Sequence, residues 1–152
     1  MELIELLQNQ QTEILAKAFD AVKRSQLKSY EKAGDEHIHQ RLKALYVLSV
    51  RAIKERNLGP MTAHAQGIAQ ERFSAGYDLS EVQTAFNVLE ETMWQAVLER
   101  LPAGEFAEAL GLIGTVLGAG KDSLARQYVS LASKTKSTSL NLQSMFSGTE
   151  GA

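Results

Sequence analysis

Three histidines are the first residues whose type and spacing could support chemistry, since the chain contains no cysteine. Glu36-x-x-His39 has the spacing at which di-iron bundle proteins place a carboxylate and an imidazole on one helix face. Such a site needs a second copy of the motif, and the sequence holds no other Glu-x-x-His. His64 is a candidate haem ligand, but its neighbours Ala63 and Ala65 are small, whereas haem needs a sizeable apolar pocket. Structural roles are therefore favoured for these histidines, and neither a metal nor a cofactor is predicted.

Glycines gather in the apolar stretch before Lys121. A phosphate loop requires Ser or Thr directly after its lysine, and Asp122 stands there instead, so nucleotide binding is rejected. Glycine inside a helix costs about 1 kcal/mol relative to alanine, so these positions need a compensating role. Close crossing of another helix is the favoured explanation. The alternative is a ligand pocket or hinge formed by Gly114, Gly118, Gly120 and Trp94.

The composition limits the classes of function. Without cysteine the chain has no thiolate nucleophile, zinc–thiolate site or disulfide switch. Its 16 basic and 18 acidic side chains give a formal net charge of -2, which favours neither nucleic acid nor a membrane as partner. No nucleophile elbow and no apolar run of about 20 residues occur. Residues 1–11 are acidic and amphipathic, unlike a secretory signal, so we expect a non-enzymatic, cytoplasmic protein.

The elements that must position these residues are helices, because apolar residues recur at steps of three and four and strand-type alternation is almost missing. Five helices are predicted, with a separate short helix possible at the first turns and a loop over residues 28–34. The fold class is all-α, a five-helix bundle. The predicted helices span residues 2–28, 35–57, 61–75 and 79–101, and the fifth starts near 103–105 and runs past Ser130.

The junction between the third and fourth helices has the clearest local signals. Gly76 suits the left-handed conformation that ends a helix. Asp78 and Glu81 have the spacing of a capping box that starts the next one. The helix that follows carries one apolar stripe, made of Val82, Phe86, Leu89, Met93 and Val97.

The last helix has a near-regular alternation of three and four between apolar residues from Phe106 to Leu131, which is typical of a bundle or coiled-coil seam. Residues 1–133 are accordingly predicted as one domain, and residues 134–152 as a Ser/Thr-rich tail or linker. Four residues of the seam are candidates for an interface with a second copy: Leu117, Leu124, Tyr128 and Leu131.

The junction also carries a family resemblance, in Glu71-Arg72, in the run Gly76-Tyr77-Asp78-Leu79-Ser80-Glu81-Val82, and in Ala85 and Leu89. It resembles the N-terminal helical domains of RsbR- and RsbRD-type stress-response regulators, which also precede some sensor histidine kinases. The resemblance implies a dimeric bundle or non-haem globin-like input module, usually joined to an output domain. Here only a short tail follows residue 133, so a stand-alone or truncated input module is expected.

These observations predict a non-enzymatic signal-input or protein-interaction module that dimerises and responds to a ligand or a signalling partner. A bundle seam that continues toward the C-terminus is suited to pass on a small shift, since packed helices have discrete arrangements. The alternative is a small-molecule or haem-binding, globin-like sensor with its cavity near residues 114–120 and His64.

Overall fold

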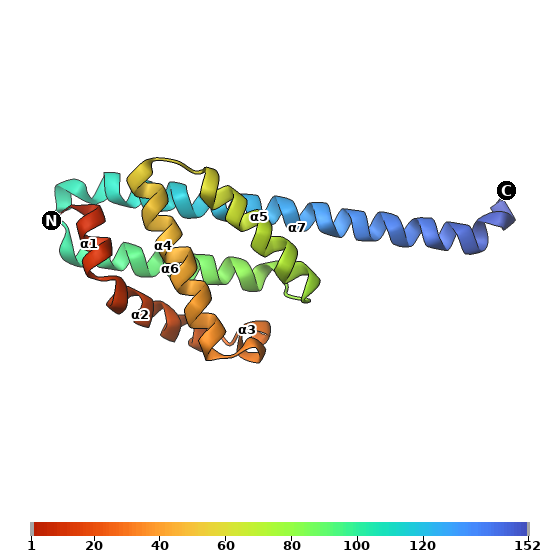
Figure 1. The fold of residues 1–152 in the computed structure, drawn as a ribbon, viewed down its shortest axis with the longest axis horizontal. Coiled ribbons are helices and arrows are strands. Elements are labelled where there is room, and N and C mark those ends of the chain that lie inside the picture. Colours follow the sequence, from red (N-terminus) through yellow and green to blue (C-terminus); the bar gives the residue numbers. More distant parts are fainter. Residues whose placement is uncertain (1, 152) are drawn as a thin grey trace.

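The computed structural model describes the backbone of residues 2–151 and the side chains of residues 2–136. Every regular element in that range is helical, which confirms the all-α prediction (Figure 1). The elements are α1 Leu3–Asn9, α2 Gln11–Arg24, α3 Lys28–Ala33, α4 Asp35–Glu55, α5 Gly59–Ser74, α6 Leu79–Arg100, the 3-10 turn η1 Ala103–Glu105 and α7 Phe106–Gly151.

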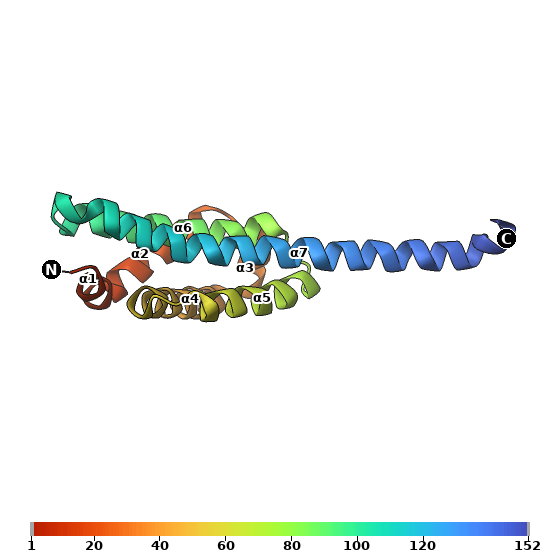
Figure 2. The same cartoon turned by 90° about the horizontal axis from the view of Figure 1, so that it is seen from above.

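The helices form two layers (Figure 2). Helices α6 and α7 lie side by side in one layer, and α4 and α5 lie in the other. The first part of α7 is packed within the domain, while its second part extends well beyond the other helices. None of the helices in the described part of the chain has the length and apolarity needed to cross a membrane.

The core is built on the apolar stripes of α6 and α7. All five predicted stripe residues of α6 are buried, with exposed fractions of 2% or less. On α7, Ile113, Leu117 and Leu124 are fully buried. Burying a side chain of this size is worth about 1.5–3 kcal/mol, so these two helices hold the domain together. The seam of α7 therefore packs inside its own chain.

Gly120 sits where α7 crosses α5 and α6. A Cβ atom at this position would lie 2.8 Å from Cε2 of Phe86 and 2.9 Å from the sulfur of Met61. Both neighbours are buried in the core, so only a residue without a side chain allows this close approach. Close helix packing, the favoured explanation for the glycines, accounts for Gly120.

The structure corrects the predicted loop at residues 28–34. Residues 28–33 form the short helix α3, and the separate short helix that the sequence allowed at the first turns is α1. Ser29 donates from its backbone N and its Oγ to the carboxylate of Glu81, each at 2.7 Å, and Tyr30 is buried. The partner lies 52 residues away, so local sequence signals could not reveal this helix.

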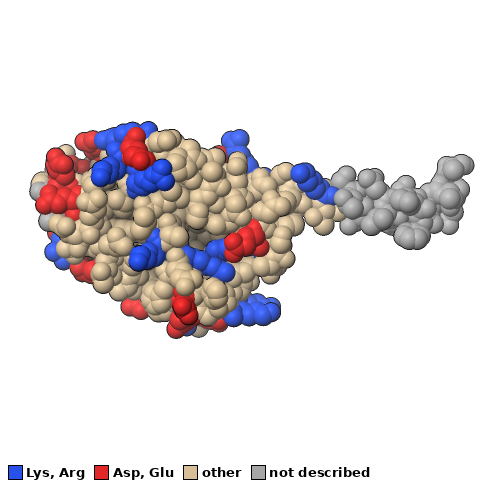
Figure 3. Space-filling model, in the orientation of Figure 1, with Lys and Arg blue, Asp and Glu red and all other residues tan. Residues whose placement is uncertain are grey.

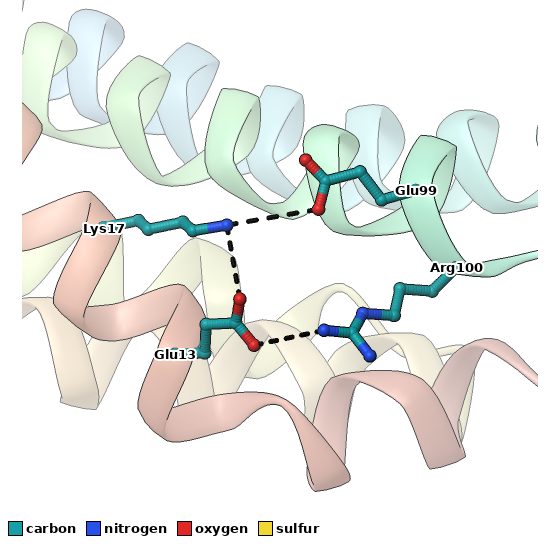
Figure 4. Close-up of polar contacts among 4 residues, drawn as sticks. All are labelled: Glu13, Lys17, Glu99 and Arg100. Carbon is teal, nitrogen blue, oxygen red and sulfur yellow. Dashed lines mark hydrogen bonds and ion pairs between the residues drawn. The ribbon is translucent and has the colours of Figure 1, made fainter.

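Two sets of polar contacts fasten α6 to its neighbours. Figure 4 shows Arg100 of α6 paired with Glu13 of α2 at 3.4 Å, and Lys17 of α2 paired with Glu99 of α6 at 4.0 Å. These side chains are about half exposed, so each pair contributes less than about 1 kcal/mol. On the other flank, Lys121 Nζ of α7 lies 3.0 Å from the buried Glu90 Oε1.

The last helix is longer than the predicted domain, because its backbone continues through the Ser/Thr-rich segment to Gly151. The sequence left open that Leu140, Leu142, Met145 and Phe146 dock on a neighbour. Those side chains lie outside the described residues. The division at residue 133 stays a prediction.

Candidate functional site

A cavity of about 360 Å³ lies among five helices, from α2 to α6. Figure 3 shows a hollow on the face that carries α4 and α5, bordered by both basic and acidic side chains. The cavity wall is mostly apolar. Its apolar residues are Val22, Ile38, Leu42, Ala44, Leu45, Ile68, Ala85 and Phe86, and its polar ones include His37, Gln40, Arg41, His64, Glu71 and Arg72.

Arg72 is the unusual residue of this wall, because its charged side chain is only 6% exposed. Its Nη1 donates to the carboxylate of Glu71, whereas its buried Nε has no hydrogen-bond partner. A buried polar group without a partner costs about 1–3 kcal/mol, and more when it is charged. Arg72 therefore presents an unused donor in a place that water scarcely reaches.

The junction between α5 and α6 positions Arg72. Tyr77 N donates to the Arg72 carbonyl at 2.9 Å, and Gly76 N donates to the Phe73 carbonyl at 3.1 Å. These are the two bonds of a Schellman motif, which needs a left-handed residue, and Gly76 has φ +85°. The helix end predicted at Gly76 is confirmed, and it brings the Tyr77 ring back over the Arg72 guanidinium, 5.7 Å away.

Tyr77 and Tyr30 form an aromatic pair between two guanidinium groups. The rings meet edge to face at 5.3 Å. Arg41 donates from Nη1 to the Tyr77 hydroxyl at 2.7 Å, and its guanidinium carbon lies 5.3 Å from that ring. Cation–π contacts of partly desolvated groups are worth about 0.5–2 kcal/mol. Arginine side chains of α4 and α5 are thus held by α3 and the junction.

Burial and the two arginines set the ionisation around the cavity. Burial lowers the pKa of His64 below its ordinary value, and the positive charge of Arg72 lowers it further while Glu71 opposes the shift. Burial raises the pKa of Tyr30, with Arg72 and Arg41 acting in the opposite direction. At neutral pH the His64 imidazole and the Tyr30 phenol are therefore neutral, beside the charged side chains of Arg41, Arg72 and Glu71.

The capping box fixes the other side of the junction. Glu81 accepts from the Asp78 backbone N at 3.0 Å, which confirms the predicted start of α6. The same carboxylate accepts both bonds from Ser29, so the cap also anchors α3 and hence Tyr30. The helix junction from Gly76 to Glu81, which the sequence predicted, therefore forms the structural frame around the cavity.

Tyr128 joins this frame to α7. The Tyr128 hydroxyl donates to the Tyr77 carbonyl at 3.1 Å, and the Tyr128 ring packs edge to face on Phe73 at 5.6 Å. Burial raises the pKa of Tyr128 to about 12, so the hydroxyl keeps its proton. The residue that separates the two arginines is therefore bonded directly to the long helix.

The site residues proposed from the sequence lie elsewhere. None of Gly114, Gly118, Gly120 and Trp94 lines the 360 Å³ cavity, although His64, considered together with them, does. Gly114 and Gly118 have open space where a Cβ would stand, and Trp94 is 36% exposed. Among the interface candidates Leu117, Leu124 and Tyr128 are buried in the chain's own core, and Leu131 is half-buried.

Sequence reasoning missed Tyr30, Arg41 and Arg72 as site residues. An arginine in the last turn of a helix is ordinarily placed there by the helix dipole and solvated. One signal in the sequence indicated that Arg72 is buried: its helical spacing places it on the same face of α5 as the buried Met61, Ala65 and Ala69.

The Glu36-x-x-His39 motif lies at the exposed start of α4, where the His39 ring stacks on Phe19 with centroids 3.7 Å apart. Among the residues that the structure describes, no group of three or more potential metal ligands comes together. His39 of the motif thus contributes to the packing of α4 on α2.

Comparison with protein families matches residues 12–133 to the family described as RsbT co-antagonist protein rsbRD N-terminal domain. The matched range holds the whole cavity, the junction and Tyr128. Comparisons with curated proteins and with solved structures gave no match. The family is one of regulatory domains in stress-response signalling. The match confirms the resemblance seen at the junction, and the chain belongs to the RsbRD N-terminal domain family.

Proposed function

We propose that the chain is a non-enzymatic signal-input module, which senses a small molecule in the cavity and passes the change to α7. The observation that carries this proposal is the bond from Tyr128 on α7 to the carbonyl of Tyr77. Tyr77 contacts the guanidinium groups of Arg41 and Arg72, so a ligand that moves either arginine acts on the residue that holds α7.

The length of α7 supports this proposal. It is a single helix of 46 residues that begins within the core and continues past it (Figure 1). Packed helices change between discrete arrangements, so a small shift at Tyr128 moves the far end of the helix as a unit. A signalling partner or an output domain would receive the signal there.

We further propose that the module is a homodimer, formed through the outer face of α6 and α7. Trp94 and Leu98 lie one helical turn apart on α6 and are 36% and 52% exposed. On α7, a Cβ atom added at Gly114 or Gly118 would have no neighbour within 4 Å, so the cost of these glycines in helix stability is not offset within the chain. A second copy packed on this face would supply the missing contact.

The contact between Lys121 and Asn87, at 3.0 Å, indicates that these residues belong to one face. Residues about two turns away on each helix point the same way. Trp94 on α6 and Gly114 on α7 occupy those places, and α6 and α7 run in opposite directions (Figure 1). The exposed apolar side chains of α6 therefore lie beside the glycine segment of α7.

Transmission can be tested without knowing the ligand. The chain has no cysteine, so Val129→Cys places a single spin label on an exposed position of α7. Arg41→Gln should change the mobility or the interprotomer distance of that label, because Arg41 contacts Tyr77 and Tyr77 is hydrogen-bonded to Tyr128 of α7. Arg51→Gln, an exposed position on the same helix, is the matched control. Identical spectra for all three proteins would contradict the proposal.

The second candidate function is haem binding, favoured only by His64 in the cavity wall. Expression with haem supply followed by an absorbance scan tests it directly. A Soret band that disappears in His64→Ala would support haem binding, and the absence of the band would remove it.

A further inference from the structure

We propose that the cavity binds a small organic monocarboxylate with an apolar body, held by Arg72, with Arg41 adding positive charge to the same wall. This inference rests on the proposed function, in which the cavity is the ligand site. It names the chemical class of the ligand.

Arg72 supplies the first argument. A guanidinium binds a carboxylate most strongly with two parallel N–H donors. Nη1 of Arg72 is already bonded to Glu71, and the buried Nε lacks a partner. The edge that contains Nε is thus the edge left for a ligand oxygen, and a carboxylate there would satisfy a donor that nothing in the described chain satisfies.

The charge balance of the wall supplies the second argument. Arg41 and Arg72 carry two positive charges, and Glu71, which is 64% exposed in its side chain, carries the one negative charge. Arg41 is bonded to a neutral phenol and has no carboxylate within ion-pair distance among the described side chains. One added negative charge would balance the wall.

The remaining wall determines the body of the ligand. Ile38, Leu42 and Leu45 of α4 line the cavity together with Ile68 of α5 and Phe86 of α6. A volume of about 360 Å³ is at the small end of the range of ligand pockets, roughly 300–1,000 Å³. An inorganic phosphate would leave this apolar surface uncovered and would bring a second negative charge near Glu71. A short alkyl or aryl carboxylate fits both features.

The test measures binding of hexanoate and benzoate to the full chain by thermal shift and by NMR of the arginine Nε–H groups. Both carboxylates should raise the melting temperature by mass action. They should also shift one Nε–H signal that is absent in Arg72→Lys. Hexanamide and benzamide, which match the shape without the charge, should bind at least tenfold more weakly, because a carboxylate accepts two charge-assisted hydrogen bonds from a guanidinium whereas an amide offers one neutral oxygen.

Substitutions of Arg41 and Arg72 test which arginine binds the carboxylate. Arg41→Gln should weaken carboxylate binding several-fold, whereas the exposed control Arg51→Gln should leave it unchanged. Arg72→Gln should weaken it at least tenfold. If that variant does not fold, the Arg72 Nε–H shift in the wild-type protein decides the same question.

Several results would overturn the inference. Amides that bind as well as the carboxylates, an unmoved Arg72 signal, or stabilisation by inorganic phosphate alone would each contradict a monocarboxylate site. If carboxylates fail while the label at residue 129 still responds to Arg41→Gln, the ligand class is wrong and the signal-input function stands. If carboxylates bind at Arg72 and that label never responds, the ligand class stands and the function is wrong.

Discussion

Arg72 places a charged side chain in the packed interior of the domain. A buried charge is tolerated only when it is paired and hydrogen-bonded. Glu71 and the Tyr77 ring provide part of that environment, and the lone Nε remains. The burial of Arg72 follows from its place on the inner face of α5, so the site is a consequence of helix packing.

His64 makes the stability of the domain depend on pH. Its pKa in the folded chain lies below the ordinary value of 6.5, because of burial and then Arg72. Below pH 6.5 the unfolded chain binds the proton more readily, so stability is full above that pH and falls as the pH drops. Arg41, His37 and Glu71 also line the cavity and belong to the same electrostatic environment.

We therefore expect His64→Gln to reduce the loss of unfolding free energy between pH 7.5 and 5.5. Urea unfolding at the two pH values measures the difference, and an NMR titration of the His64 ring in the wild type measures its pKa. An equal loss in both proteins, or a ring pKa at or above 6.5, would contradict this assignment.

Gly120→Ala should destabilise the domain by up to about 2 kcal/mol. The new Cβ would meet Phe86 and Met61 at under 3.0 Å, and overpacking of a core costs about 1–3 kcal/mol. The gain in helix propensity, about 1 kcal/mol, offsets part of that cost. The free energy of unfolding of this variant is compared by chemical denaturation with that of Gly67→Ala in α5. A Cβ at Gly67 meets open space, so the same gain in helix propensity should stabilise the domain. Equal stabilisation by both changes would contradict close packing at Gly120.

At the scale of elements, a short junction organises helices that are far apart in the sequence. Its Schellman motif ends α5, and its capping box starts α6. Glu81 of that box also holds α3 through Ser29, and the Tyr77 carbonyl holds α7 through Tyr128. Loss of one of these bonds should loosen several helices together.

Glu81→Gln tests this role. Burial opposes ionisation of Glu81, but the bonds from Ser29 and Asp78 and the charge of Lys28 outweigh it, so its pKa lies below 4.5. A carboxylate with a lowered pKa stabilises the fold above its unfolded pKa, and that stability is lost as the pH falls through the folded pKa. We expect a loss of about 1 kcal/mol at pH 7, because hydrogen bonds to a charged group are replaced by neutral ones.

The difference between wild type and Glu81→Gln should shrink below about pH 4.5, where the wild-type carboxylate becomes protonated. Urea unfolding across pH 3–7 measures it, with Glu91→Gln, an exposed glutamate on the same helix, as the control. A constant difference over that range would contradict the role given to the charge.

The elements with strong local signals were predictable from the sequence. Helical periodicity located α4, α5, α6 and the start of α7, and Gly76 with Asp78 and Glu81 located the junction. Helix α3 was missed because it depends on Ser29 and Tyr30 contacting residues distant in the chain. The cavity was missed for the same reason, since it needs side chains from five helices.

At the scale of the whole molecule, the two layers have different roles. The layer of α4 and α5 bears most of the cavity wall, and the layer of α6 and α7 offers an outer face with Trp94, Leu98 and two uncovered glycines. Periodicity in the sequence identified α7 as a seam, but it could not tell whether the seam faces its own chain or a second copy. The packed structure places Leu117 and Leu124 inward and leaves the glycine face outward.

Sedimentation equilibrium of the wild type and of Leu98→Glu tests the account most directly. We predict a dimer at micromolar concentration for the wild type and a monomer with unchanged helicity for Leu98→Glu, since a charge at a packed apolar face is costly. Val47→Glu places the same charge on a similarly exposed position of α4 and should remain dimeric. A wild type that stays monomeric at high micromolar concentration, or a Leu98→Glu protein that still dimerises, would contradict the account.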